Sequence, residues 1–115
     1  MENLKLQITE LLSAEATVIV EGKKDKKAVE MLGAEDVVLL NKPMHRILDE
    51  VSERDKPVII LTDLDKEGKA LYGKLAQGLQ SRGVKIDNRL RNLLFKDTKL
   101  RQIEGLTTYL QGQDI

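Results

Sequence analysis

The chain has 115 residues, of which 33% are charged and 41% hydrophobic, and its mass of 13.0 kDa fits one folded domain but not two. Its 19 basic and 19 acidic residues cancel to a formal net charge of zero, which argues against a surface that is basic all over. Cysteine is absent and histidine occurs once, which excludes disulfides, thiol catalysis and metal sites built from those residues.

Charge is distributed unevenly along the chain. Residues 1–65 contain 9 basic and 14 acidic residues, whereas residues 66–115 contain 10 basic and 5 acidic ones. The C-terminal part is therefore the better candidate for contact with a polyanion. The longest apolar runs have four residues, far fewer than the roughly 20 that cross a bilayer, and the N-terminus does not resemble a signal peptide. We expect a cytoplasmic protein with no membrane partner.

Apolar residues alternate between helical and strand spacing. A helical pattern from Leu4 to Leu12 precedes a β-branched run from Ala16 to Val20. Asp25 is expected to cap the next helix, which Gly33 ends. A strand over Val37–Leu40 follows, and then a helix in which four apolar residues share one face, namely Met44, Ile47, Leu48 and Val51.

The second half continues the alternation. Val58–Leu61 predicts a third strand, and Leu71, Leu75 and Leu79 predict a helix that runs to about Ser81. A short fourth strand is expected over Val84–Ile86, and the rest is expected to be helical in two pieces. Strands that alternate with helices pair in parallel, with helices on both faces of the sheet. The sequence predicts one α/β domain over residues 1–115, with a three-layer core at about 15–88, an N-terminal helix and a C-terminal helical extension over 89–115.

Three carboxylates follow predicted strands. Glu21 comes after the first strand, and Asp63 and Asp65 come after the third. Carboxyl ends of parallel strands meet at the edge where such sheets bind ligands. For all three carboxylates to meet, the first and third strands must be neighbours, which gives the sheet order 2-1-3-4. An oxygen-only set of this kind suits Mg²⁺, or Mn²⁺, which retains water and completes its shell with phosphate oxygens.

Residues beside these carboxylates are suited to phosphate. Lys23, Lys24 and Lys66 can contact nonbridging phosphate oxygens, and Gly22 and Gly68 allow close approach to backbone amides. A purely structural alternative is that the aspartates cap a helix, Glu21 pairs with a lysine and the glycines only turn the chain. Aromatic residues are scarce, so recognition is expected to rest on phosphates and shape rather than on base stacking.

Two motifs in order resemble those of the Toprim domain. These are Val20–Asp25 (VEGKKD) after the first strand and Asp63–Gly68 (DLDKEG) after the third. Topoisomerases, bacterial primases and a class of nucleases share this domain. The chain resembles most a small stand-alone Toprim protein and the Toprim domain of the bacterial 5S ribosomal RNA maturation nuclease.

The resemblance implies a compact Rossmann-like Toprim fold and Mg²⁺-dependent phosphodiester chemistry on nucleic acid. It also implies that Glu21 is a catalytic acid or base that helps to hold metal, and that Asp63 and Asp65 are metal ligands. A nuclease on structured RNA or DNA is the leading hypothesis. The alternatives are a noncatalytic module that binds nucleic acid, or a protein partner through its C-terminal helices, in RNA processing or DNA repair, and, ranked lower, a domain phosphorylated on aspartate.

Overall fold

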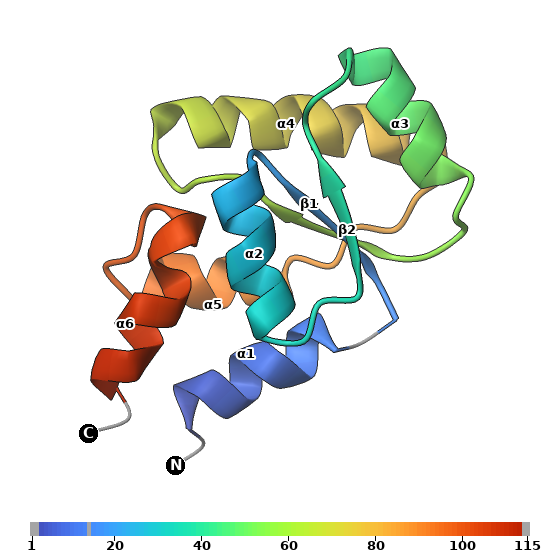
Figure 1. The fold of residues 1–115 in the computed structure, drawn as a ribbon. Coiled ribbons are helices and arrows are strands. Elements are labelled where there is room, and N and C mark those ends of the chain that lie inside the picture. Colours follow the sequence, from blue (N-terminus) through green and yellow to red (C-terminus); the bar gives the residue numbers. More distant parts are fainter. Residues whose placement is uncertain (1–2, 14, 114–115) are drawn as a thin grey trace.

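The computed structural model describes residues 3–13 and 15–113, and within them an α/β fold built around a parallel sheet (Figure 1). Three strands form this sheet: β1 (Thr17–Val20), β2 (Asp36–Leu39) and β3 (Val58–Leu61). The helices that precede the end of β3 are α1 (Leu4–Leu12), α2 (Lys23–Met31) and α3 (Met44–Ser52). Those that follow it are α4 (Lys66–Gln80), α5 (Arg89–Asp97), the 3-10 turn η1 (Ile103–Gly105) and α6 (Leu106–Gln113).

The strand order is β2-β1-β3, and both pairings are parallel. Val20 lies beside Leu39 on one side and beside Leu61 on the other, so the three strands end at the same level. The residues that follow β1 and β3 therefore emerge side by side. This confirms the prediction that the first and third strands are neighbours.

The predicted fourth strand is wrong as a strand. Its residues form a single parallel bridge, in which Val58 donates to the Lys85 carbonyl at 2.9 Å and accepts from the Asp87 amide at 2.8 Å. The ladder stops there because the Asp87 carboxylate accepts a hydrogen bond from the Arg89 amide (3.1 Å) and turns the chain into α5. Only the place of the segment, beside β3, agrees with the predicted order 2-1-3-4.

Helices cover both faces of the sheet, which explains why every residue of β1 and β3 is buried and nearly all are apolar. On one face, side chains of α1, α2, α5 and α6 pack with Val18, Val20, Ile59 and Leu61. On the other face, α3 and α4 pack against Ile19, Val38, Val58 and Ile60. Figure 1 shows the two groups of helices above and below the strands.

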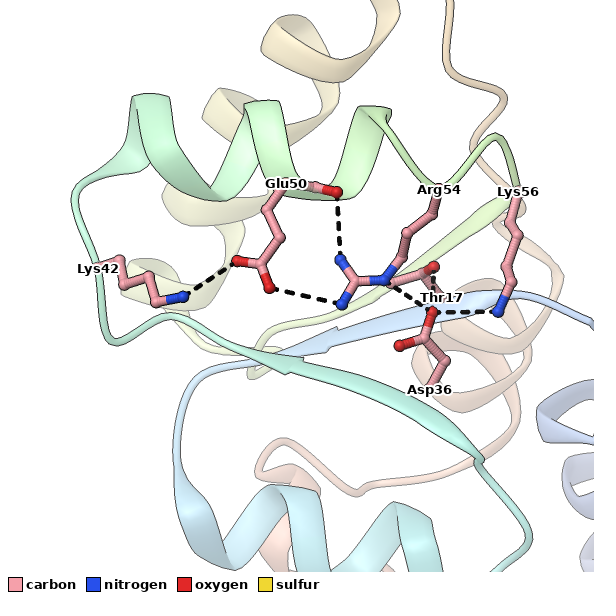
Figure 2. Close-up of polar contacts among 6 residues, drawn as sticks. All are labelled: Thr17, Asp36, Lys42, Glu50, Arg54 and Lys56. Carbon is pink, nitrogen blue, oxygen red and sulfur yellow. Dashed lines mark hydrogen bonds and ion pairs between the residues drawn. The ribbon is translucent and has the colours of Figure 1, made fainter.

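A polar network fixes the opposite end of the sheet, where the strands begin (Figure 2). One oxygen of Asp36 accepts from the Thr17 hydroxyl at 2.8 Å and lies 3.1 Å from Arg54 Nε and 3.3 Å from Lys56 Nζ. These bonds lower the pKa of Asp36 despite its partial burial. Arg54 also reaches Glu50, which in turn pairs with Lys42. Each cation of this network, namely Lys42, Arg54 and Lys56, is therefore paired with a carboxylate of the protein.

Candidate functional site

Glu21 and Asp63 meet at the carboxyl end of β1 and β3. Glu21 Oε2 accepts a hydrogen bond from the backbone amide of Asp63 at 2.6 Å. Because Val20 and Leu61 are in register, the residues just beyond them are close enough for this bond. The structure thus brings together two of the three predicted metal ligands.

Asp65 begins α4, and its Oδ1 accepts from the Gly68 amide at 2.8 Å. The buried Thr62 hydroxyl donates to the Gly68 carbonyl at 2.6 Å, which closes the turn from the other side. A side chain on Gly68 would collide with the Asp63 backbone, lying 2.5 Å from its carbonyl carbon. Asp65 therefore has the capping role of the structural alternative, while its charge remains close enough to raise the pKa of Glu21.

Asp25 is a fourth carboxylate of this edge and is only 7% exposed. Its Oδ2 accepts from the Gly22 amide at 3.0 Å, and it also accepts a backbone hydrogen bond from Glu104. The sequence indicated Asp25 as a helix cap, but α2 begins at Lys23, with Gly22 in the cap position and Asp25 in the first turn. Burial, together with the charges of Asp63 and Glu104, raises the pKa of Asp25.

The burial of Glu21 and its carboxylate neighbours determine its pKa. Burial is the largest cause of its raised pKa, and the negative charges of Asp63, Asp25 and Asp65 add to it, against the hydrogen bond from the Asp63 amide, which lowers it. A carboxyl group with a raised pKa exchanges a proton more readily near neutral pH than an ordinary glutamate. Glu21 shares this raised pKa with Asp25, the other partly buried carboxyl group of the edge.

Arg91 lies beneath the acidic edge and is missing from the sequence-based site. It is 8% exposed and donates to the carbonyls of Thr62 (2.7 Å), Ile60 (3.3 Å) and Asp63 (3.3 Å). Its guanidinium also stacks 4.7 Å from the centre of the Tyr72 ring. Desolvation lowers the pKa of Arg91, while the nearby charges of Glu21 and Asp63 favour its cationic form. The buried cation fixes the loop that carries Asp63.

The C-terminal extension completes this edge of the protein. The Ile103 amide donates to Asp63 Oδ1 at 2.9 Å, and the Leu64 amide donates to the Arg101 carbonyl at 2.6 Å. A shallow hollow of about 440 Å³ lies between Asp65 and the extension, where it is lined by Lys99 and Arg101 among others. Sequence reasoning missed these contacts because they are made by backbone groups, which no residue pattern reveals.

The predicted phosphate-binding residues are arranged around this edge. Lys23, Lys24 and Lys66 are exposed, and the ion pairs of the described residues include none of them. The amides of Gly22 and Gly68 are occupied by Asp25 and Asp65, so a phosphate would have to displace a carboxylate to reach them. Phosphate contact by these five residues stays a prediction.

The carboxylate oxygens of this edge are suitable ligands for a hard divalent cation. In each of Glu21, Asp63 and Asp65, one carboxylate oxygen accepts a hydrogen bond from a backbone amide. The other carboxylate oxygen accepts no hydrogen bond from the described residues. Carboxylate oxygens with open positions are what Mg²⁺ uses beside its own waters. Residues 3–13 and 15–113 nevertheless contain no group of three acidic or histidine side chains already arranged around one ion.

The helices of the described ranges include none that is long and apolar enough to span a membrane.

Comparison with known proteins identifies relatives of this chain. The model of the Toprim domain matches residues 16–91. A UPF0292 protein of Methanocaldococcus jannaschii is 36% identical over 113 residues, covering 91% of this chain and 88% of its own. A UPF0292 protein of Pyrococcus horikoshii is 38% identical over 101 residues, with 86% and 75% covered. The solved structure of a protein from Aquifex aeolicus superposes with a TM-score of 0.81 at 36% identity, covering 90% of this chain and 98% of that one.

Proposed function

Because the chain belongs to the Toprim domain family, we propose that it is a metal-dependent nuclease that acts on structured RNA or DNA. The observation that carries the proposal is the pairing of Glu21 with the Asp63 amide at 2.6 Å, at the edge where Asp65 also lies. Paired parallel strands that end in acidic residues form a suitable place for phosphodiester chemistry. Cytoplasmic location and a single domain over residues 1–115 are part of the same proposal.

In this proposal Glu21 transfers the proton. Its raised pKa suits a group that gains and loses a proton during one reaction cycle. Mg²⁺ or Mn²⁺, held by Glu21, Asp63 and Asp65, would supply positive charge to the phosphate oxygens. Arg91 keeps the Asp63 loop in place from below through its three carbonyl contacts.

The exposed lysines bind the substrate backbone. Lys23 and Lys24 start α2, and Lys66 starts α4, so all three flank the acidic edge from the two loops that form it. Their charges offset the repulsion between a phosphate and the carboxylates, which would otherwise keep nucleic acid away. The substrate therefore contacts positive residues around a negative centre.

A second candidate function is a noncatalytic module that binds nucleic acid or a protein, in RNA processing or DNA repair. It is favoured by one observation, namely that Lys23, Lys24 and Lys66 are exposed beside the edge and take part in no ion pair of the described residues. In that case the basic surface binds without turnover, or a partner completes the site. Such a protein has salt-dependent affinity for nucleic acid but does not cleave it.

The experiment that separates these functions uses structured RNA, single-stranded DNA and supercoiled DNA, each incubated with Mg²⁺, Mn²⁺ or EDTA. The variant compared with wild type is Asp65→Asn, purified in the same way. Asparagine caps a helix as well as aspartate does but carries no charge, so the fold is kept while the ligand charge is removed. Cleavage that needs metal and is lost in Asp65→Asn supports the nuclease. Binding without cleavage by the folded wild type supports the second function, and equal cleavage by both proteins refutes the assignment of the site.

A further inference from the structure

One aromatic ring is exposed close to the acidic edge. Phe95 on α5 is 44% exposed, whereas the other exposed large apolar side chains of the described residues, Leu6 and Met31, are aliphatic. Two cations lie over the Phe95 ring: Lys69 Nζ at 4.6 Å and Arg101 Cζ at 5.3 Å from its centre. We call Phe95, Lys69, Lys99 and Arg101 the basic-aromatic patch.

This patch is continuous with the candidate site. Arg101 accepts through its carbonyl the hydrogen bond of the Leu64 amide, inside the Asp63–Asp65 loop. Arg101 and Lys99 also line the hollow of about 440 Å³ whose other wall includes Asp65. Lys69 lies on the first turns of α4, the helix that Asp65 caps. A chain seated on Phe95 can therefore pass directly to the acidic edge.

The cations of the patch are available to an anionic partner. None of Lys69, Lys99 and Arg101 pairs with a carboxylate in the part of the chain that the structure describes, unlike the cations of Figure 2. The Arg101 guanidinium is held by the carbonyls of Leu100 (2.7 Å) and Thr98 (3.3 Å), so it is oriented before any partner arrives. Oriented, unneutralised cations are typical of a phosphate-binding surface.

We propose that the basic-aromatic patch binds an unpaired segment of nucleic acid, with one base stacked on Phe95 and the neighbouring phosphates against Lys69, Lys99 and Arg101. The inference rests on the proposed function in taking nucleic acid as the partner, and it adds the class of substrate: a strand with unpaired nucleotides next to the cleaved bond. The scarcity of aromatic residues does not oppose this, because one ring is enough for one base.

The ring distinguishes an unpaired strand from a duplex. Phosphate contacts alone are available from both forms, whereas a base inside a duplex is stacked on its neighbours and cannot present its face to Phe95. A nucleic acid suits the patch better than a protein, because Lys69, Lys99 and Arg101 pair with no carboxylate of the described residues and can contact the phosphates of a strand. The observations therefore favour a single strand.

The test measures binding in EDTA, where cleavage does not interfere. A labelled single-stranded oligonucleotide and a blunt duplex of equal length are titrated by fluorescence anisotropy with wild type, Phe95→Ala and Phe95→Trp. Phe95→Ala is expected to weaken single-strand binding roughly 5- to 150-fold, which is the usual effect of removing one stacking ring. Duplex binding is expected to change by less than about twofold, and Phe95→Trp is expected to retain single-strand affinity. Leu6→Ala, an exposed apolar side chain on α1, is the matched control.

The role of the cations is tested in the same assay. Arg101→Gln and Lys69→Gln are each expected to reduce the slope of log affinity against log salt by about 0.7 for the single strand. Lys85→Gln, an exposed lysine beside the start of β3, is expected to leave that slope unchanged. If Phe95→Ala does not fold, Arg101→Gln and Lys69→Gln still test the proposal.

Four results would overturn the proposal: unchanged single-strand binding by Phe95→Ala, an equal loss on duplex, an unchanged salt slope in both patch variants, or no nucleic-acid binding by wild type. The last result would favour a protein partner at the patch. The nuclease proposal fails separately. If wild type never cleaves but Phe95→Ala has weaker single-strand binding than wild type, the nuclease proposal is refuted and the proposal for the patch is retained.

Discussion

Gly68→Ala is expected to open the turn that carries the aspartates. An alanine side chain there would lie 2.5 Å from the Asp63 carbonyl carbon and 2.8 Å from its amide nitrogen, and it would also collide with the Asp63 carbonyl oxygen. Ordinary contacts between such atoms are about 3.5–4.0 Å, so the turn must move by about 1 Å. Since the obstacle is backbone, no change of rotamer can relieve it.

The cost follows from the bonds that such a movement breaks. The Thr62 hydroxyl bond to the Gly68 carbonyl and the Gly68 amide bond to Asp65 are now 2.6 Å and 2.8 Å long, and an added 1 Å takes both beyond hydrogen-bonding distance. A neutral bond contributes about 0.5–1.5 kcal/mol and one to a charged group about 1.5–3. We expect the free energy of unfolding to fall by roughly 2–4 kcal/mol, which lowers Tm by roughly 8–20 °C.

Urea and thermal unfolding followed by circular dichroism measure this change, with Gly73→Ala as the matched control in the same helix. A side chain on Gly73 meets nothing within 4 Å, so alanine there is expected to raise stability by about 0.5–1 kcal/mol. The two glycine substitutions thus have opposite signs. Equal stability of Gly68→Ala and wild type would refute the close packing of this turn.

Three further predictions concern charged groups. Arg91→Met is expected to lower the free energy of unfolding by roughly 2–4 kcal/mol in urea titrations, because it leaves the β3 carbonyls without their buried donor; a loss below about 0.5 kcal/mol would contradict this. Burial and like charges raise the pKa of Glu21, so its contribution to stability is present below pH 4.5 and is lost as the pH rises through the higher folded pKa. Glu21→Gln should therefore match or exceed wild type in Tm at neutral pH, and a lower Tm would count against the repulsion. The lowered pKa of Asp36 has the opposite sign: its contribution is present above pH 3.8 and is lost as the pH falls through the folded pKa. Asp36→Asn should show a smaller acid-induced fall in Tm than wild type, and an equal fall would exclude Asp36 as a cause.

Much of the fold follows from local sequence patterns. The apolar runs before Glu21 and Asp63 are buried strands as expected, because continuous apolar character suits a sheet covered on both faces. Met44, Ile47, Leu48 and Val51 likewise share the core-facing side of α3. The neighbouring positions of β1 and β3 were predictable only through the assumption that the carboxylates act together.

Other features depend on tertiary contacts that the sequence does not reveal. The segment at Val84–Ile86 has strand-like residues, but only Val58 offers it a free edge before Asp87 turns the chain. An arginine is usually exposed, so the sequence does not indicate that Arg91 is buried. It is buried because three backbone carbonyls at the end of β3 need a hydrogen-bond donor. The bond between the Ile103 amide and Asp63 joins residues 40 positions apart. Because the donor is a backbone amide, the type of residue at position 103 does not indicate this bond.

The most direct test of the central claim is the cleavage rate of Glu21→Gln beside wild type and Glu67→Gln, under single turnover with Mg²⁺, on the substrate that wild type cuts. Glu67 is an exposed carboxylate in the first turn of α4 with no hydrogen bond to the acidic edge, so its variant controls for lost charge. The account predicts that Glu21→Gln remains folded and loses at least about 100-fold in rate, as expected when a general acid or base is removed, while Glu67→Gln cleaves at close to the wild-type rate. Cleavage by folded Glu21→Gln at the wild-type rate would contradict it.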